Sequence, residues 1–504
     1  MLELLGSGFA VALEPRNLLA LVAGALAGMI VGIIPGIGPS VGVALLLPFT
    51  YGLPADAALI MLASLYQVAE YGGSIPAILI STPGTPAAAA TVLDGYALAR
   101  HGQPGKALGY SITASALGGF AGVLLLAVLA GPVARLALQL GPAEFFAFGV
   151  FGLTAVISLA SGSLLKGLLS GVLGLLLSTV GMDVFTGYSR FNLGRFELFE
   201  GIPLVPILIG LFAGAEALRL VGEELDVRVR LPRTAFEVWL TRREVRGVLP
   251  AIGIGTLVGA VVGVFPGLGA GTASWLAYNC VRLSSKRQKE FGSGVPSGIA
   301  APESANNAVV GMALIPLLTL GIPGSPTAAV MMGALMLHGV QPGPQVFSEH
   351  PGVIYGLFAS MVLGIGLLWA LGVSTTRVFA RAVEVPNRVM GPLVLILSAI
   401  GAFAVRNLMF DVWMMLAFSV LGYVLRKSGF SAPALVLAFV LGPMVESNLR
   451  RALLMADGAW SVFLRSPAAA TALAFAVLSL VVSVRGLLPT HAKLTNPAAQ
   501  AGSG

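Results

Sequence analysis

Short runs of proline, glycine and hydroxyl residues interrupt apolar segments at two matching places in the chain. One run is Ser81-Thr82-Pro83-Gly84-Thr85-Pro86, and the other is Gly321-Ile322-Pro323-Gly324-Ser325-Pro326. Proline removes a backbone donor and glycine releases the chain from helical dihedrals, so such runs open a helix. Freed N–H groups favour an anion, whereas freed carbonyls favour a cation such as sodium. We expect two hairpin tips that bind a small anionic substrate; the simpler alternative is a surface turn joining two helices. The candidate substrate-binding residues are Ser81, Thr82, Gly84, Thr85, Gly321, Gly324 and Ser325.

A second pair of breaks precedes these runs. Pro35-Gly36-Ile37-Gly38 aligns with Pro266-Gly267-Leu268-Gly269, and the motifs that follow recur in the same order. The chain is therefore a duplication. Helix breaks at matching places in two membrane halves indicate a transporter whose site is built from discontinuous helices. We expect the carbonyl groups at Gly36, Gly38, Gly267 and Gly269 to help bind a coupling ion, Na⁺ or H⁺.

Acidic and amide residues lie close to the runs. Glu70 ends an apolar segment, and an acid at a helix C-terminus opposes the helix dipole unless a cation, a proton or a basic neighbour offsets it. Glu303 follows a proline, so ordinary helix-start chemistry is the alternative explanation for it. We expect Glu70 and Glu303 to bind the ion and Asn306 and Asn307 to bind substrate or the coupling cation, with a structural role for each left open.

The composition predicts a membrane protein. Hydrophobic residues make up 57% of the chain and charged residues 10%, far below the roughly one quarter that is charged in soluble domains. A spanning helix needs about 20 residues, so the apolar runs predict an all-α polytopic membrane protein with about ten to twelve crossings plus broken or re-entrant pieces. The net charge of +7 comes from basic residues scattered among loops, which indicates membrane orientation rather than nucleic-acid binding. The single cysteine, Cys280, excludes an internal disulfide and a thiolate metal cluster; we expect no transition metal and no cofactor.

Two resemblances to enzyme motifs are weak. Gly38-Pro39-Ser40-Val41-Gly42 matches GxSxG, but no strand precedes it and the four histidines lie in loops or the tail. Gly267-Leu268-Gly269-Ala270-Gly271 lacks both a βαβ context and a Walker lysine. We therefore expect no enzymatic activity.

Loop charges predict that the two halves have inverted topology. Residues 51–57 contain no Lys or Arg, whereas residues 99–107 contain Arg100 and Lys106. In the second half the pattern is exchanged: the loop after the PGxG break is basic, and residues 338–351 contain no Lys or Arg. Cytoplasmic loops collect Lys and Arg, so equivalent loops face opposite sides. The basic residues of that second-half loop are Arg282, Lys286, Arg287 and Lys289.

We divide the chain into a first membrane repeat (1–220), a cytoplasmic linker (221–247), a second membrane repeat (248–488) and a disordered tail (489–504). In the linker, the stretch from Phe236 to Arg246 fits either an amphipathic helix in the headgroup region or a solvated connector with an aromatic against the bundle. The run 248–281 has basic residues on both flanks. It therefore crosses an even number of times or turns back as a hairpin at the PGLG break.

On these motifs the chain resembles the large membrane subunit of the tripartite tricarboxylate transporter family. The resemblance rests on PGIGPS, PGLGAG, EYGGSIPAILISTPGTPAAAATVLDGYALARHGQPGKAL and FGSGVPSGIAAPESANNAVVGMALIPLLTLGIPGSPTAAVMMGALMLHGVQPGP. It implies a bacterial inner-membrane permease that imports carboxylates with an ion gradient. The implied partners are a small membrane subunit and a periplasmic solute-binding protein, and a homo-oligomer is left open. It also suggests an elevator-type movement. The rival class is a channel-like or structural membrane subunit without ion coupling.

Overall fold

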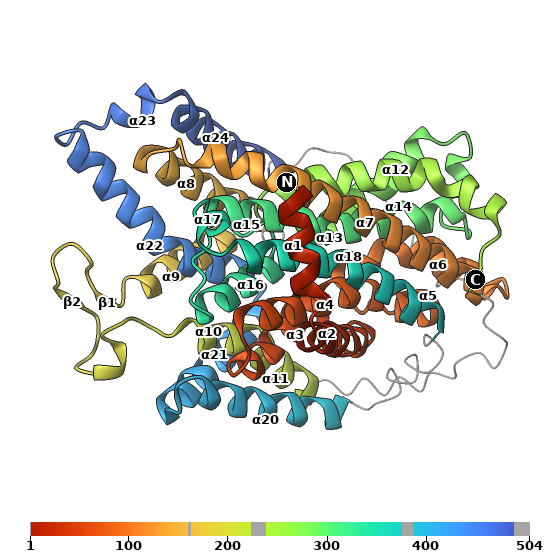
Figure 1. Ribbon diagram of the computed structural model, residues 1–504, viewed down its shortest axis with the longest axis horizontal. Helices are drawn as coiled ribbons and strands as arrows, with labels where there is room; N and C mark the ends of the chain where they lie inside the picture. Colours follow the sequence, from red (N-terminus) through yellow and green to blue (C-terminus); the bar gives the residue numbers. More distant parts are fainter. Residues whose placement is uncertain (1, 160–162, 223–237, 375–386, 488–504) are drawn as a thin grey trace.

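The computed structural model describes residues 2–159, 163–222, 238–374 and 387–487. Most of the predicted linker and all of the predicted tail therefore lie outside the described residues. Within these ranges the chain forms a helical bundle, from which one short two-stranded ribbon projects at the left of Figure 1. The ribbon pairs β1 (Gly181–Met182) antiparallel with β2 (Ser189–Arg190).

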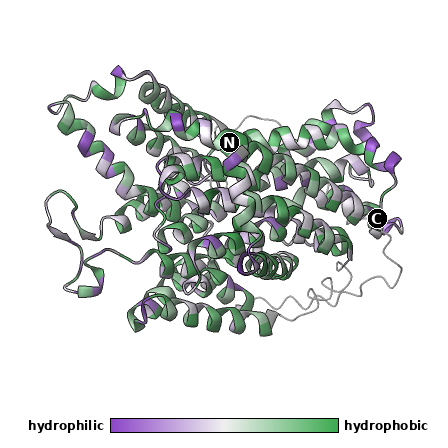
Figure 2. Cartoon of the chain, in the orientation of Figure 1, coloured by the Kyte–Doolittle hydropathy of each residue, from purple (hydrophilic) through white to green (hydrophobic). Residues whose placement is uncertain are grey.

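Long apolar helices confirm the predicted all-α polytopic membrane protein. Among the described residues, eight helices are long and apolar enough to cross a membrane, and six shorter apolar helices accompany them. Figure 2 shows hydrophobic residues along the outer helices, and side chains such as Leu19, Leu165 and Leu257 are exposed there. Helices that are apolar on their outer as well as their inner faces suit a lipid environment. A total of about ten to twelve crossings requires some of the shorter helices to cross as well.

The first half begins with a re-entrant hairpin. Helices α2 and α4 run in the same direction, because Gly24, Gly28 and Gly32 face Met61, Leu65 and Ala69 in turn. Their starts are joined by Arg16 and Asp56, which are 3.1 Å apart. Since α4 starts where α2 starts, α3 has to return the chain, and the turn falls at the PGxG break. The elements are α1 (Leu2–Ala12), α2 (Pro15–Ile33), α3 (Gly38–Leu46), η1 (Leu47–Thr50) and α4 (Ala55–Gly72).

The second half repeats this arrangement. Gly255 and Gly259 of α12 face Ala301 and Ala305 of α14, so these helices are also parallel. Helix α13 therefore returns the chain, and of the two alternatives for residues 248–281 the structure has the hairpin at the PGLG break. The elements are α12 (Arg242–Val264), α13 (Gly269–Ser284), η5 (Gln288–Glu290) and α14 (Pro296–Met312).

Each half then contains a helix that is interrupted by a return loop. Helix α5 ends at Ser81, whose φ is 59°, and the chain comes back so that the N–H of Gly84 donates to the carbonyl of Gly73 over 3.0 Å. Helix α6 then runs beside α5 in the same direction, because Gly95 lies against Ile78. The prediction of hairpin tips is thus wrong in detail. A residue with left-handed backbone dihedrals ends each short helix, and the chain then returns to the start of that helix. The elements are α5 (Ser74–Ile80), η2 (Pro86–Ala88), α6 (Ala89–Arg100), α15 (Leu314–Leu320), α16 (Pro326–Leu337) and α17 (Val346–Glu349).

Loops that the charge pattern assigns to one side lie together. Lys106 and Glu244 form an ion pair at 3.1 Å, and the N–H of Gly292 donates to Asp94 over 2.9 Å, so three basic loops meet at one end. Thr50 and His338 form a hydrogen bond of 3.0 Å at the other end, where the loops lack Lys and Arg. The halves therefore run in opposite directions, as in an inverted repeat.

The two halves also interlock. Helix α7 of the first half packs on α14 of the second, where Gly118 faces Ser304 and Gly122 faces Ala308, and α18 packs on α4. A second group of helices flanks this centre in Figure 1, with α8, α9, α22 and α24 on one side and α11, α20 and α21 on another. The remaining bounds are α7 (Pro104–Ala137), α8 (Pro142–Leu159), α9 (Leu164–Ser178), η3 (Phe196–Leu198), α10 (Leu204–Leu208), the π-helical η4 (Ile209–Gly214), α11 (Ala215–Gly222), α18 (Pro351–Ser374), α20 (Asn387–Arg406), α21 (Met409–Lys427), α22 (Ala432–Met455), α23 (Val462–Arg465) and α24 (Pro467–Leu487).

The described end of the linker fits the connector alternative. Val238 is buried, and the ring of Trp239 meets that of Trp369 edge-on at 5.4 Å. Thr241 and Glu244 form a capping box that starts α12. The arginines assigned to an amphipathic linker helix therefore belong to the first turns of α12, which a capping box initiates.

Candidate functional site

The four helix interruptions meet in the interior. The N–H of Gly267 donates to the carbonyl of Gly324 over 3.2 Å, so the second PGxG turn touches the second return loop. In the first half, a side chain at Gly84 would collide with the carbonyl of Gly32, which puts the first return loop against the end of α2. Only glycine permits such close backbone approach. Each break therefore adjoins the return loop of its own half.

The start of α13 joins the two pairs. A Cβ placed on Gly269 would lie 3.9 Å from Pro326, and one placed on Gly271 would lie 3.6 Å from Pro86. Both return loops thus flank the first turn of one helix. The structure brings together predicted residues that are more than 200 positions apart in the sequence.

Hydroxyl groups cap the helices that leave the return loops. Thr85 accepts from the N–H of Ala88 over 3.3 Å, and Ser325 accepts from the N–H of Ala328 over 3.1 Å. Ser325 also lies 3.2 Å from the hydroxyl of Tyr66, a residue that the sequence analysis did not select.

The two loops differ in accessibility. Ser81 is exposed and Thr82 half-buried, whereas Gly321, Gly324 and Ser325 are buried. The symmetric sequence motifs thus occupy unequal environments in this conformation.

Glu70 and Asn306 place unpaired oxygen atoms in a buried region. The amide of Asn306 donates to the backbone carbonyl of Glu70 over 3.2 Å. Among the described residues, Glu70 Oε2 and Asn306 Oδ1 are buried and have no hydrogen-bond partner. Buried polar atoms normally find partners, and oxygen atoms of this kind are the ligands that hard cations prefer. Asn307 differs, because its amide donates to the carbonyl of Glu303 in its own helix over 3.3 Å.

Glu303 lies in the interior of α14, so the helix-start explanation for it is wrong. It is fully buried and accepts hydrogen bonds from Ser74 and Thr91, each 2.5 Å long, on one oxygen and from Ser115, at 2.9 Å, on the other. All three donors belong to the first half. No local motif signals them, because each is a single serine or threonine on a different helix.

A buried ion pair faces the first PGxG turn. Glu216 is fully buried and bonded to Arg219 at 2.5 Å and to Arg426. A Cβ on Gly36, whose φ is 93°, would collide with the Arg219 guanidinium and lie 2.6 Å from Glu216. The second turn lacks this contact, since Gly267 faces Val156. Nothing lies within 4 Å of a Cβ placed on Gly38. Glu216 and Arg219 were not predicted from the sequence, because they lie far along the chain from the break.

Two cavities adjoin the second pair of interruptions. One of about 760 Å³ lies between the second return loop and α22 and includes Gly321, Gln341, Gln345 and Asn448 in its lining. Another, of about 330 Å³, is lined by apolar side chains and includes Pro266 and Ile322. Volumes of 300–1,000 Å³ are typical of small-molecule sites. In the part of the chain that the structure describes, no three His, Cys, Asp or Glu residues are grouped to hold a metal ion.

An inverted pair of re-entrant hairpins and interrupted helices that meet inside a multi-pass bundle defines the class of α-helical membrane transporters. The chain belongs to the tripartite tricarboxylate transporter TctA family, whose model matches residues 18–437. The chain is therefore a permease subunit of that transporter family, and the family implies further subunits.

Two proteins of Agrobacterium vitis are similar to this chain. One, an uncharacterized 52.8 kDa protein in the TAR-I ttuC' 3'region, is 41% identical over 486 residues and covers 96% of each chain. The other, an uncharacterized protein in the TAR-II ttuC' 3'region, is 40% identical over 232 residues, which are 46% of this chain and 95% of that protein. No solved structure matches the chain.

Proposed function

We propose that this chain is the large permease subunit of a secondary transporter that imports tricarboxylates or related carboxylates into a bacterium across the inner membrane. A periplasmic solute-binding protein delivers the substrate, a small membrane subunit completes the complex, and an ion gradient drives uptake. The observation that carries the proposal is that each helix break adjoins the return loop of its own half and that both return loops flank the start of α13. Irregular backbone is tolerated at membrane depth only inside protein or along a wet cavity.

The substrate site lies at the return loops. Backbone N–H groups and the hydroxyls of Thr82, Thr85 and Ser325 would bind carboxylates, since Lys and Arg are absent from both loops. The cavity of about 760 Å³ at Gly321 supports a route to this site from the end that carries Gln345. By the loop charges, that end is periplasmic.

The coupling-ion site lies at Glu70 and Asn306. Their unpaired buried oxygens support sodium binding, with carbonyls at the glycine turns as additional ligands. A proton on Glu70 is the alternative coupling ion. Glu303 has three hydroxyl donors, which supports a structural role for that carboxylate.

Uptake into proteoliposomes tests the function. The permease and small subunit would be reconstituted, and radiolabelled citrate and other di- and tricarboxylates would be offered with the cognate binding protein. We expect uptake that needs both the binding protein and an inward sodium gradient, and accumulation against the substrate gradient. A channel-like subunit would only equilibrate the substrate, with or without sodium. Equilibration without accumulation under sodium and proton gradients alike would exclude the proposal.

A further inference from the structure

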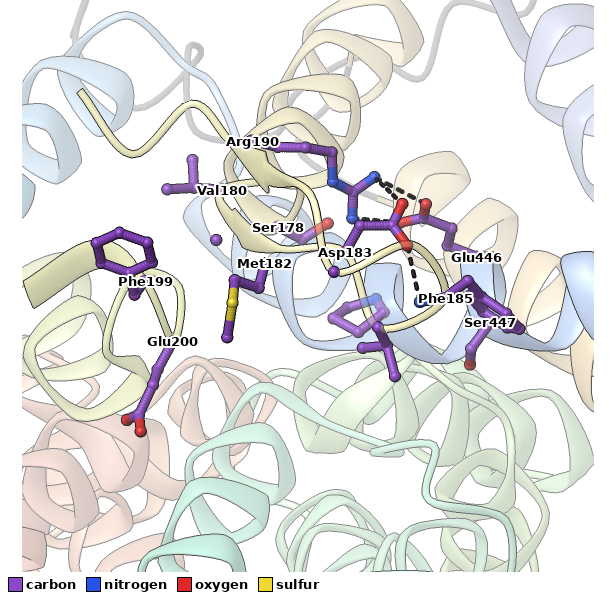
Figure 3. Close-up of a pocket in the computed structure, with 14 residues that line it drawn as sticks. Ser178, Val180, Met182, Asp183, Phe185, Arg190, Phe199, Glu200, Glu446 and Ser447 are labelled. Carbon is purple, nitrogen blue, oxygen red and sulfur yellow. Dashed lines mark hydrogen bonds and ion pairs between the residues drawn. The ribbon is translucent and has the colours of Figure 1, made fainter. Parts of the chain in front are cut away.

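The two halves carry matching charged clusters on the helices that flank the centre. Arg219 and Arg450 lie equally far along the chain from Gly36 and Gly267, respectively, and each follows a leucine. Arg219 pairs with Glu216 on α11, and Arg450 pairs with Glu446 on α22 at 2.8 Å. In the second cluster, Arg190 also bonds Glu446 at 2.8 Å (Figure 3). Arg450 bonds Asp183, likewise at 2.8 Å.

Within the described residues, the first cluster contacts the PGxG turn of its half and the second cluster does not. Gly36 lies against Arg219 and Glu216, whereas Gly267 lies against Val156 of α8. The second cluster instead borders a cavity of about 550 Å³, shown in Figure 3. Besides charged residues, its lining includes Val180, Met182, Phe199 and Ser447.

The second glycine turn lies a short distance from that cavity. A Cβ placed on Gly152 would lie 3.8 Å from Pro266 and 3.6 Å from Leu441 of α22, so the turn lies near Leu441. Leu441 precedes Glu446 by five residues, and a helix rises about 1.5 Å per residue, which gives a separation of roughly 7 to 8 Å along α22. Five residues also advance a helix by about 500°, so Glu446 faces about 140° away from Leu441. To reach the second cluster, the PGLG turn would have to slide by this distance along α22 and also move around it.

We propose that the cavity bordered by Asp183, Arg190 and Glu446 is the docking site for the PGLG turn of this same chain in a second conformation. In that conformation the PGIG turn leaves Glu216, so the two clusters are occupied alternately. A helix break frees N–H and C=O groups that need polar partners inside a membrane protein, and a carboxylate beside a guanidinium supplies both acceptors and donors. The inference rests on the proposed function, since alternating access requires the turns to move relative to α11 and α22.

Cysteine chemistry in a Cys280→Ser background tests the proposal in the full-length purified protein. The pair Gly152→Cys and Ile322→Cys reports the described conformation, because a Cβ on Gly152 lies 3.1 Å from Ile322. Ser447→Cys, labelled with a charged maleimide, reports whether the cavity is open. If the Gly152→Cys and Ile322→Cys pair perturbs packing, labelling of Ser447→Cys still reports the conformation.

Glu216→Gln weakens the first docking site and should therefore populate the second conformation. We expect the ratio of the described to the second conformation to fall about tenfold, the effect of losing one charged hydrogen-bond partner, and both disulfide yield and maleimide labelling to fall with it. Glu446→Gln should lower neither signal. Asp411→Asn is the matched control, since Asp411 is a buried carboxylate bonded to Arg406 away from both turns.

Equal signals in Glu216→Gln and Asp411→Asn would overturn the docking proposal. Uptake assays separate this outcome from the transport function. If the disulfide-locked protein still transports, the alternating docking is wrong while transport stands. If no protein transports but labelling shifts as described, the docking stands and the transport proposal fails.

Discussion

The side-chain amide of Asn306 donates to the backbone carbonyl of Glu70 over 3.2 Å, which joins the two halves at the inner end of α4. The same pair leaves Asn306 Oδ1 and Glu70 Oε2 buried and without hydrogen-bond partners in the described part of the chain. Two buried oxygen atoms that accept no hydrogen bond are suitable ligands for a cation. The contact also explains why an acid can end an apolar helix: the ion would offset both its charge and the helix dipole.

Glu70→Gln should therefore raise the sodium concentration needed for half-maximal uptake while changing substrate affinity little at saturating sodium. A neutral amide removes the negative charge that holds the cation but keeps the size of the side chain. If a proton is the coupling ion, the same variant should abolish the pH dependence of uptake. Sodium titrations of uptake are the measurement, with Glu144→Gln, a carboxylate at the start of α8, as control. Normal ion dependence in both assays would assign Glu70 a structural role.

Ser325→Val and Thr82→Val should each weaken substrate affinity without loss of membrane insertion. Valine keeps the shape of Thr82 and adds one methyl group at Ser325, and in each case it removes a hydroxyl from a return loop. Ser325 is also an N-cap, so that variant should lose about 1 kcal/mol of stability as well. Ser431→Val removes the cap of α22 away from the loops and controls for this loss. Substrate titrations in which both loop variants match wild type would remove the loops from the site.

Tyr66→Phe separates binding from capping at the second loop. It deletes the hydroxyl that lies 3.2 Å from Ser325 but leaves the bond from the N–H of Ala328 intact. We expect a change in substrate affinity larger than the change in melting temperature. A variant that melts earlier but binds normally would make the contact purely structural.

Ser115→Ala should destabilise the fold by about 1–3 kcal/mol, because it removes a hydrogen bond to a buried carboxylate. The hydroxyl of Ser115 lies 2.9 Å from Glu303. Ser360→Ala is the control, since this buried hydroxyl donates only to its own helix, at Leu357, over 2.8 Å. Thermal unfolding in detergent measures the difference. Equal melting temperatures in the two variants would mean that the bond to Glu303 adds nothing.

Cysteines placed near Arg100 and Lys286 should be labelled from the cytoplasmic side, and cysteines near Ala55 and Gln345 from the periplasmic side. The loop contacts already group these positions at two ends of the molecule. Intact spheroplasts treated with an impermeant maleimide give the measurement, and permeabilised cells show that every site can react. Labelling of all four from outside would contradict the inverted repeat.

The β1–β2 hairpin should stay anchored from neutral pH down to about pH 4 and loosen as the pH falls towards 2. The backbone N–H of Phe185, with the Arg450 guanidinium and the N–H of Thr186, lowers the pKa of Asp183 to about 2 against the opposing effect of burial. A lowered pKa means that the carboxylate stabilises the fold above its unfolded value and loses that effect as it protonates. Proteolysis of the hairpin against pH should show this transition in wild type. Asp183→Asn should be cleaved equally at every pH.

The sequence predicted the parts of the site that local chemistry determines. The interruptions at Gly36, Gly84, Gly267 and Gly324 follow from proline and glycine within apolar runs, and the loop charges grouped the ends of the halves correctly. The return loops were misread as hairpin tips because Ser81 adopts a left-handed conformation, which is uncommon for residues other than glycine.

Tertiary packing determines the rest. The hydroxyls that bind Glu303 come from residues 188 to 229 positions away, and Arg219 reaches Gly36 only after α11 packs beside the first hairpin. A single serine on an apolar helix gives no signal of such a partner. The same holds for Tyr66, whose hydroxyl contacts Ser325 from 259 positions away.

The hydrogen bonds to Glu303 impose an order on biosynthesis. The three donors to Glu303 are synthesised well before Glu303 itself; they are Ser74, Thr91 and Ser115. Helix α7 is likewise synthesised before α14, the helix that packs along it. The first half therefore enters the bilayer before Glu303 can accept from its three hydroxyls. The side of α7 that will contact α14 is still uncovered at that stage. Once α14 is synthesised, it packs on α7 and its Glu303 accepts the three hydrogen bonds. The contact between the two halves forms at this step. A truncated product ending before Pro296 would lack α14 and would leave this face of α7 uncovered.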